Sequence, residues 1–378
     1  MTETLPTTMR AAVLREAGKP MAIEHIPVPH PRANEVLVKV SACGMCHSDL
    51  HVLGGAISFP LPAVVGHEIA GEIVELGPMA DRAGFAVGDR VAGAFLMPCG
   101  HCEACARGRD DLCDPFFSLN RLKGRLYDGE TRLADNDGTP IAMYSMGGLA
   151  EYCVVPVTAV AKTPDVIDTR AGSILGCAAL TAYGAVRRGA DLRFGESVAV
   201  VAVGGVGSGI ITLARAFGAK HVIAIDVDDE KLAAAAKLGA THTINSLKVD
   251  DLHAAVCAIT GTSGVDVAFE ALGQPATWKS ALDVLADGGR MVPIGLGAGV
   301  QTAAVEINRL VRRSQSILGS YGARTRQDLP EVVRLAAEGV IRYRDQVTRH
   351  FSLEQVNEGY AALRAGETVG RGVIDMSL

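Results

Sequence analysis

Hydrophobic and polar positions follow two different patterns along this chain of 378 residues. In the first half, short Val-rich runs alternate with glycine and proline, as at residues 35–40 and 88–92. Runs of this kind, bounded by turn residues, predict short antiparallel strands, and little of this half follows a helical period. We therefore expect a β-rich, barrel-like domain here.

The second pattern begins near Thr169, where apolar runs alternate with helical segments rich in Ala and Leu. Such alternation is typical of a doubly wound parallel sheet. After about Gly322 the helical period returns, and the chain ends in an apolar strand. The candidate strands of the parallel sheet are 197–203, 221–225, 265–270, 289–294 and 316–319; the candidate helices are 229–238, 328–338 and 353–365, and the final strand is 372–376.

Composition and charge exclude several classes of protein. The chain is 48% hydrophobic and 21% charged, proportions of an ordered globular protein. Its net charge is −6 without a long basic block, so nucleic acid is not an expected partner. The first residues lack the basic end and apolar run of a signal peptide. The uncharged stretch 197–214 contains four glycines, which predicts a strand, a turn and a helix start, not a membrane span. We expect a cytoplasmic protein without a membrane partner.

Four cysteines form a compact group at Cys99, Cys102, Cys105 and Cys113. Zinc in a structural site is held by four ligands in a tetrahedron, and short spacings of this kind allow four thiolates to turn inward. Four unrelated free thiols are the alternative, and an iron–sulfur cluster is disfavoured by the spacing. We predict a structural zinc site, with the intervening His101 facing solvent.

A second group of metal-binding residue types is spread along the chain, at Cys46, His67 and Cys177, with further polar residues beside the first two. Taken alone, each fragment carries little information, because single cysteines and histidines are commonly packing or surface residues. A catalytic zinc takes three protein ligands and keeps an open position. Together these residues are candidates for such a site.

With these residues in view, the chain resembles the zinc-dependent medium-chain alcohol dehydrogenases over essentially its whole length. The resemblance is strongest at 66–71 with Gly77, in the four-cysteine group and at 88–91. It implies an α/β protein of two domains. These are a GroES-like, β-rich catalytic domain at 1–178 and 322–378, with a structural zinc lobe at 99–113, and a Rossmann dinucleotide-binding domain at 179–321.

The resemblance also implies the role of each metal-site residue. Cys46, His67 and Cys177 correspond to the catalytic zinc ligands, so that each chain would hold two Zn²⁺ ions. Asp49 corresponds to the carboxylate that orients His67, since a ligating imidazole needs its other N–H held. Glu68 corresponds to an acid near the metal that either binds zinc transiently or tunes its field. The other cysteines, Cys43, Cys153 and Cys257, match no ligand position and are interpreted as packing residues.

The dinucleotide-binding fingerprint is incomplete, because Ala202 stands where the first glycine is expected. Ala can serve the tight turn if its φ is negative, while Gly204 allows the pyrophosphate to approach and Gly207 allows close packing of helix and strand. Asp226 follows the next strand and can bind the adenosine ribose, and its charge would repel the phosphate of NADP. We therefore favour NAD(H). A helix-capping role for Asp226 is the alternative.

Other functional residues are given by the resemblance alone. Ser48 would accept the alcohol proton and pass it through the coenzyme ribose to His51. The implied coenzyme contacts are Gly205 in the turn, Lys231 near the ribose, Thr181 and Val206 near the nicotinamide, and His47 and Arg371 at the pyrophosphate. The implied pocket residues are Phe95, Leu296 and Tyr321. Residues 114–148 are similar to an extra stretch of the longer, usually dimeric members, which favours a homodimer over a tetramer.

The expected reaction is reversible hydride transfer between a primary or secondary alcohol and NAD, giving an aldehyde or ketone. A thiol-adduct dehydrogenase of the glutathione-dependent formaldehyde type is an alternative, and a requirement for added thiol would favour it. Polyol or amino-alcohol oxidation is disfavoured by Cys177, because those relatives tend not to use a cysteine as the third zinc ligand. A non-catalytic zinc-ribbon module would leave the second metal group and the nucleotide segment unexplained.

Overall fold

The computed structural model describes residues 5–297 and 299–378, which fold into two compact units. Unit 1 comprises the chain up to Cys177, Arg324–Ala337 and Arg349–Leu378, and unit 2 comprises Ala178–Ala323 and Glu338–Thr348. The sequence assigned the last of these segments to the catalytic domain. That assignment is wrong for Glu338–Thr348, because the helix in this segment, α11 (Tyr343–Gln346), packs on α5 (Gly205–Ala216) of unit 2.

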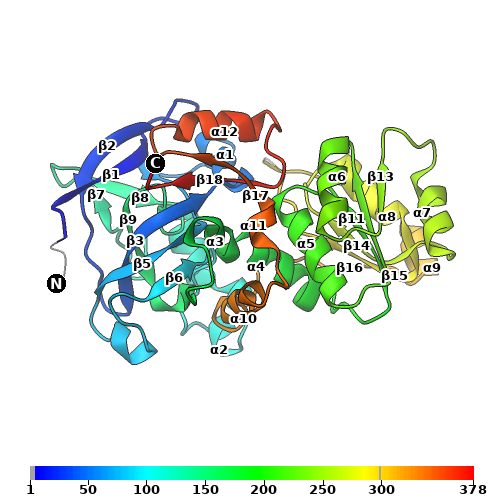
Figure 1. The fold of residues 1–378 in the computed structure, drawn as a ribbon, viewed down its shortest axis with the longest axis horizontal. Helices are drawn as coiled ribbons and strands as arrows, with labels where there is room; N and C mark the ends of the chain where they lie inside the picture. The colour runs from blue at the N-terminus through cyan, green and yellow to red at the C-terminus, as the bar shows by residue number, and fades with distance from the viewer. Residues whose placement is uncertain (1–4, 298) are drawn as a thin grey trace. The chain divides into compact units, whose positions relative to one another are not determined.

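Unit 1 contains two sheets, drawn in blue to green in Figure 1 except for the orange to red strands β17 and β18. Most of these strands pair antiparallel, and the short β4 and β8 pair in parallel. The first sheet has the order β2 (Ala22–Pro27), β1 (Thr8–Leu14), β4 (Ala63–Val64), β8 (Pro140–Met143) and β7 (Leu133–Ala134). The second has the order β10 (Val160–Lys162), β6 (Arg90–Gly93), β5 (Ile69–Leu76), β3 (Glu35–Gly44), β18 (Arg371–Asp375) and β17 (Val347–Phe351), with β9 (Tyr152–Pro156) also paired to β3.

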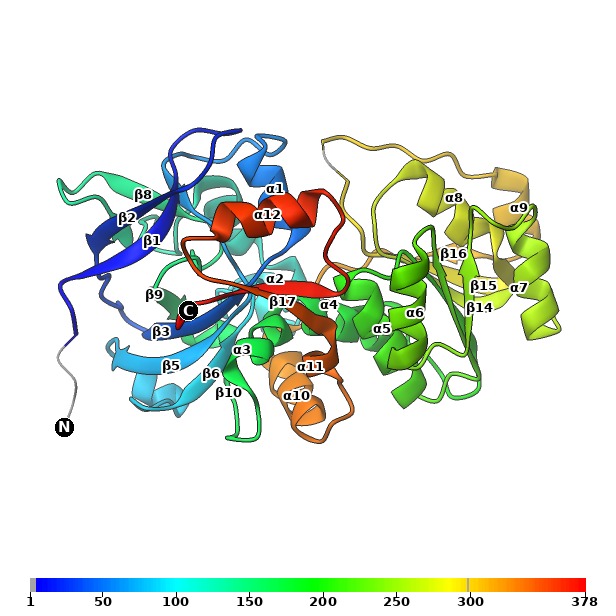
Figure 2. The ribbon, with the colours of Figure 1, turned by 45° about the horizontal axis from the view of Figure 1, so that its top comes forward.

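Residues from opposite ends of the sequence complete the second sheet. β18 pairs antiparallel with β3, bringing Val373 opposite Gly44. Helix α12 (Val356–Arg364), drawn in red, lies next to α1 (His47–Leu53) in Figures 1 and 2. The remaining helices of unit 1 are α2 (Glu103–Ala106), α3 (Thr169–Gly172) and α10 (Thr325–Ala337). The predicted β-rich domain is confirmed, and its final strand comes from the C-terminus.

Unit 2 is built on a six-stranded sheet in which all neighbouring strands pair in parallel. The central strand β11 is buried at all five residues, as expected for a strand covered on both faces. The order is β13 (His242–Asn245), β12 (His221–Asp226), β11 (Ser197–Val201), β14 (Val265–Glu270), β15 (Leu285–Pro293) and β16 (Ser316–Ile317). The other helices are α4 (Ala178–Tyr183), α6 (Asp229–Leu238), α7 (Leu252–Thr260), α8 (Pro275–Asp283) and α9 (Ile307–Arg312).

Local signals fix the ends of these helices. The side chain of Asp228 accepts hydrogen bonds from the first turn of α6, and Gly239 ends the helix with a φ of 118°. Helix α8 has a proline in its first turn, where the missing N–H is not needed. The uncharged stretch 197–214 forms β11, a turn and the start of α5, as predicted. Within the described residues, none of the helices combines the length and the apolar character needed to cross a membrane.

Candidate metal centres and coenzyme-binding turn

The first candidate metal centre begins at the start of α1. Cys46 has an extended backbone and precedes the helix, whose third residue, Asp49, is fully buried. The Asp49 carboxylate accepts hydrogen bonds from the backbone N–H of Cys46 and of Gly66, each at 3.3 Å. The carboxylate thus joins the two segments that supply the Cys46 thiol and the neighbouring His67.

Four side chains converge beside Asp49 within unit 1. One ligand atom each of Cys46, His67, Glu68 and Cys177 lies within 4.8 Å of the other three, and all four residues are buried. His67 and Glu68 directly precede β5, and Cys177 lies at the end of unit 1. Residues separated by 131 positions in the sequence, from Cys46 to Cys177, therefore form one cluster of soft sulfur, nitrogen and oxygen donors.

One ring nitrogen of His67 is held by a carboxylate, and the other is without a hydrogen-bond partner among the described residues. Its Nδ1 lies 3.0 Å from Asp49 Oδ1, and Asp49 Oδ2 accepts a hydrogen bond of 2.8 Å from the Tyr360 hydroxyl. The Nε2 atom is buried and finds no hydrogen-bond partner within the described part of the chain. Buried polar atoms are rarely left unsatisfied. An imidazole held at Nδ1 by a carboxylate, with Nε2 facing two thiols, fits a zinc ligand.

Arg371 supplies a positive charge to the same cluster. Its guanidinium is buried, lies 2.5 Å from Glu68 Oε1 and 3.6 Å from Cys46 Sγ. The resemblance implied a pyrophosphate contact for Arg371. In this structure the guanidinium contacts Glu68 and Cys46, and the pyrophosphate contact stays a prediction.

The buried charges change the proton affinities of the cluster. A hydrogen bond with Cys177 holds the pKa of Cys46 well below its ordinary value, while the same contact and burial raise the pKa of Cys177. Burial raises the pKa of Glu68 to about 7 against the opposing effect of Arg371. Burial lowers the pKa of His67, but the Asp49 carboxylate outweighs it and raises the value to about 10.

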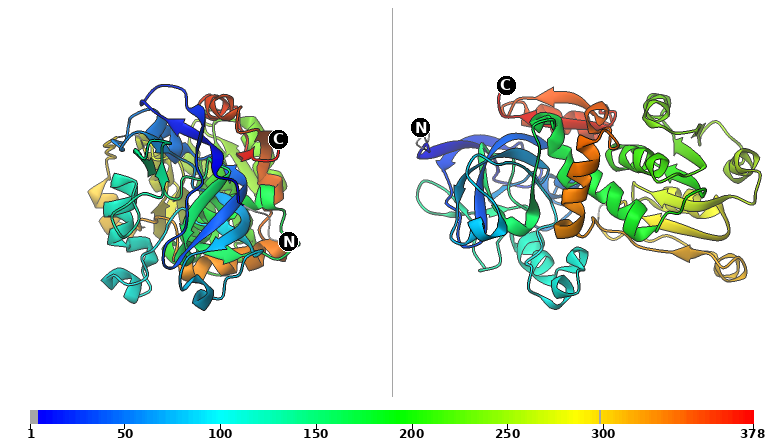
Figure 3. Two further views of the ribbon diagram at one scale, coloured as in Figure 1. Left: turned by 90° about the vertical axis from the view of Figure 1, so that its left-hand side faces the viewer. Right: turned by 60° about the horizontal axis from the view of Figure 1, so that its bottom comes forward.

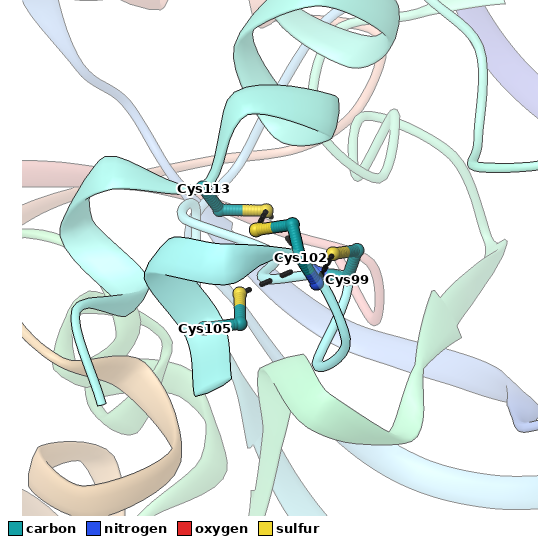
Figure 4. Close-up of side chains that lie close together, drawn as sticks. All are labelled: Cys99, Cys102, Cys105 and Cys113. Carbon is teal, nitrogen blue, oxygen red and sulfur yellow. Dashed lines mark hydrogen bonds between the residues drawn. The ribbon is translucent and has the colours of Figure 1, made fainter. Parts of the chain in front are cut away.

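The second candidate metal centre is the four-cysteine group, whose side chains turn toward one another in Figure 4. The Sγ atoms of Cys99 and Cys105 are 4.0 Å apart, as are those of Cys102 and Cys113. A tetrahedron with zinc–sulfur bonds of about 2.3 Å places its sulfurs about 3.8 Å apart. Hydrogen bonds from Cys105 lower the pKa of Cys102 to about 7 against the effect of burial. The group therefore fits a tetrahedral zinc.

The surrounding lobe, cyan in Figure 3, is held to the rest of unit 1 by polar contacts. Arg326, near the start of α10, pairs with the buried Asp110 at 2.6 Å and donates to the carbonyl oxygen of Cys105 at 2.6 Å. The Tyr127 hydroxyl donates to the carbonyl oxygen of Met97. His101 is exposed, as predicted.

The coenzyme-binding turn joins β11 to α5 in unit 2. Ala202 has a φ of 71°, which corrects the expectation of a negative φ, because the turn demands the left-handed conformation even without glycine. A Cβ on Gly207 would lie 2.2 Å from the carbonyl oxygen of Ala202, so this position requires glycine. A Cβ on Gly204 would meet nothing within 4 Å. The helix start is thus accessible at Gly204 and closely packed at Gly207.

Asp226 ends β12 next to this turn. Its Oδ2 accepts a hydrogen bond of 2.8 Å from the Val203 N–H, and its Oδ1 accepts from Val227 and Asp228 at 2.8 and 3.1 Å. The residue that caps α6 is Asp228, which rules out the alternative capping role for Asp226. A carboxylate offers about four acceptor positions, so Asp226 retains acceptor capacity for a ribose.

The other sequence-predicted residues divide between the two units. In unit 1, Ser48 Oγ lies 3.6 Å from Cys46 Sγ, and the Phe95 ring lies 6.1 Å from the His67 ring. His47 and His51 also lie in unit 1, on α1, with His47 exposed. Unit 2 carries Thr181 on α4, Gly205 and Val206 at the start of α5, Lys231 on α6, and Leu296 and Tyr321 in the segments after β15 and β16.

Sequence reasoning missed Tyr360, which holds Asp49, and Tyr144, whose ring lies 5.8 Å from the His67 ring. Neither residue belongs to a motif. A helical period does place Tyr360 on a buried helix face, but only the packing of α12 shows which carboxylate its hydroxyl meets.

Comparison with known proteins identifies the family to which the chain belongs. Residues 32–165 match the family described as alcohol dehydrogenase GroES-like domain, and residues 205–338 match zinc-binding dehydrogenase. The chain is 34% identical to the NDMA-dependent alcohol dehydrogenase of Amycolatopsis methanolica, covering 97% of this chain and 98% of the relative. It is 31% identical to the S-(hydroxymethyl)glutathione dehydrogenase of Paracoccus denitrificans, covering 95% and 98%.

A solved structure gives the same result. The crystal structure of benzyl alcohol dehydrogenase from Acinetobacter calcoaceticus superimposes with a TM-score of 0.90, at 30% identity, over 97% of this chain and 99% of that one. The chain therefore belongs to the zinc-dependent medium-chain alcohol dehydrogenase family. It is an oxidoreductase with a GroES-like unit and a Rossmann unit.

Proposed function

We propose that this protein is an NAD-dependent alcohol dehydrogenase with two zinc ions per chain, converting primary or secondary alcohols reversibly to aldehydes or ketones. The observation that carries the proposal is the His67 imidazole. Its Nδ1 is held by Asp49, and its Nε2 is buried and unsatisfied among the described residues, in a cluster with two thiols. Cys46, His67 and Cys177 would hold the catalytic zinc, and the four-cysteine group the structural one.

When bound, zinc supplies a Lewis acid that lowers the pKa of an alcohol hydroxyl. The chain's own residues would orient the ligands and move the proton. Asp49 and Tyr360 hold His67 in one orientation, and Arg371 holds Glu68 by an ion pair. Ser48 lies beside Cys46 and would accept the alcohol proton, which His51 would pass to solvent.

Unit 2 would bind the coenzyme, which accepts the hydride. The open approach at Gly204 fits a pyrophosphate at the start of α5. Asp226 would accept hydrogen bonds from the adenosine ribose and repel the extra phosphate of NADP, which supports NAD as the coenzyme. A homodimer in the cytoplasm remains our proposal for the assembly and location.

The test is a zinc count combined with a screen for NAD reduction over primary, secondary and aromatic alcohols. Cys177→Ala is expected to lose one zinc per chain and all turnover while staying folded, because one ligand of an otherwise packed site is removed. Cys105→Ala is expected to lose the other zinc and stability. Cys257→Ala is the matched control, since Cys257 lies in neither cluster, and should keep both ions. Turnover by Cys177→Ala would contradict the ligand assignment.

A thiol-adduct substrate is a second candidate, favoured by the similarity to the S-(hydroxymethyl)glutathione dehydrogenase. Activity on formaldehyde that appears only with added glutathione would support it. Equal activity without thiol would argue for a free alcohol.

A further inference from the structure

Two segments with uncommon backbone conformations meet beside His67. Residues Phe116–Arg121 form a π-helical turn, and Ser145, which is fully buried, has a φ of 55°. Both conformations are rare and unfavourable in an ordinary chain, and both concentrate at functional sites. Neither segment has a role in the chemistry proposed above.

Buried hydrogen bonds fix these segments to each other and to the metal centre. The amide nitrogen of the buried Asn120 donates to the carbonyl oxygen of Ser145 at 3.0 Å, and the Ser145 hydroxyl donates to the carbonyl oxygen of Phe95 at 2.9 Å. These bonds hold the residue that directly follows Tyr144.

Aromatic rings surround the His67 imidazole on this side. The rings of Tyr144 and Phe95 meet it edge to face, at 5.8 and 6.1 Å between centroids. The Phe59 ring packs against Tyr144 at 5.3 Å. This part of unit 1 therefore offers an aromatic environment next to the proposed zinc.

A positive charge lies against the Tyr144 ring. The guanidinium carbon of Arg121 is 3.9 Å from the centre of that ring. Stacking on an aromatic face uses the flat side of a guanidinium, and the N–H groups in its plane suit a carboxylate, which they bind with two parallel hydrogen bonds. Arg121 and His67 thus both contact the Tyr144 ring.

We infer that Arg121 is a specificity-determining residue that binds a carboxylate on the alcohol substrate, next to the Tyr144 ring that borders His67. The inference rests on the proposed alcohol dehydrogenase activity and names its substrate class. An aromatic alcohol acid and a peptide thiol adduct both carry such a carboxylate, and the experiment separates them.

The test compares 4-(hydroxymethyl)benzoate with its neutral methyl ester, in wild type and in Arg121→Gln. The wild type is expected to prefer the carboxylate. Arg121→Gln should lower kcat/KM for the carboxylate about tenfold or more and for the ester less than about threefold, because only the charged hydrogen bonds are lost. Arg125→Gln, an exposed arginine of the same segment, is the matched control and should change neither value.

Two further measurements complete the test. S-(hydroxymethyl)glutathione, formed from formaldehyde and glutathione, is the third substrate, and a larger loss on it than on the benzoate would identify the thiol adduct as the source of the carboxylate. Calorimetric titration of 4-(hydroxymethyl)benzoate without coenzyme measures binding independently of turnover. If Arg121→Gln does not fold, Arg121→Lys, which keeps the charge but not the paired donors, should show a smaller loss in the same direction.

A wild type that prefers the ester, or an Arg121→Gln variant that loses activity equally on both compounds, would overturn the inference while leaving the alcohol dehydrogenase activity intact. If neither compound is oxidised, the proposed oxidation of aromatic alcohols is contradicted, and the titration alone tests the inference. Weaker binding of the carboxylate by Arg121→Gln then supports the inference, and unchanged binding refutes it.

Discussion

At the scale of single residues, the metal centre depends on which atoms of His67 are already engaged. Asp49 occupies Nδ1, so that only Nε2 faces Cys46 and Cys177. Tyr360 in turn holds the second oxygen of Asp49. This series of contacts fixes the orientation of the imidazole ring before any ion binds.

Asp49→Asn is therefore expected to weaken zinc binding about 10- to 100-fold, because the ligand loses its charged hydrogen-bond partner. Competition with a chromogenic chelator measures the affinity. Asp165→Asn, at a fully exposed side chain, serves as the control. Equal affinities for both variants would show that Asp49 has no part in orienting His67.

The residues of the site could be predicted to different degrees. The proposed ligands stand in short motifs such as Gly66-His67-Glu68, which a sequence can reveal. Arg121, Tyr144 and Tyr360 could not be predicted, because their positions depend on a π-helical turn, a buried loop and the packing of a C-terminal helix. A motif records local spacing and not these long-range contacts.

At the scale of elements, periodicity predicted every strand of unit 2 except β13, and among its helices α6 and the start of α5. β14 and α6 have the predicted bounds, since a buried apolar run and a capped Ala-rich helix leave strong local signals. Short helices such as α1 were not predicted, because seven residues are too few to establish a period. β16 is two residues shorter than its predicted range, 316–319.

The turn between β11 and α5 gives a prediction at this scale. Ala202→Gly is expected to stabilise the protein by less than about 1 kcal/mol, because relief of the left-handed φ exceeds the greater chain entropy of glycine. Ala236→Gly, at an exposed position within α6, should instead destabilise by about 0.5–1 kcal/mol. Chemical unfolding measures both, and a shift of the same sign in the two variants would contradict the assigned strain.

At the scale of the whole molecule, unit 1 is assembled from three separated stretches of sequence. The stretches after Arg324 supply Arg326 to the zinc lobe, and Tyr360 and Arg371 to the other metal centre. The sequence indicated a return of the chain to this unit, but the contacts themselves span more than 200 positions and leave no local signal.

The anchoring of the lobe can be tested through Arg326. Arg326→Met should destabilise the lobe by about 1–3 kcal/mol, because the buried Asp110 carboxylate loses its partner. Zinc would then leave the four cysteines faster, which release into a chelator and limited proteolysis near residues 99–113 can follow. Arg334→Met, which breaks an exposed ion pair on the same helix, should leave both rates unchanged. Similar rates in the two variants would contradict the anchoring role.

The order in which the polypeptide is synthesised gives the Tyr360 and Arg371 contacts a further consequence. Cys46 and His67 leave the ribosome well before the side chains that hold Asp49 and Glu68, which follow their partners by 311 and 303 positions. A nascent chain truncated before Tyr360 carries the thiols without these buried partners. We therefore expect the proposed catalytic ion to be loaded only after these later residues have emerged and packed.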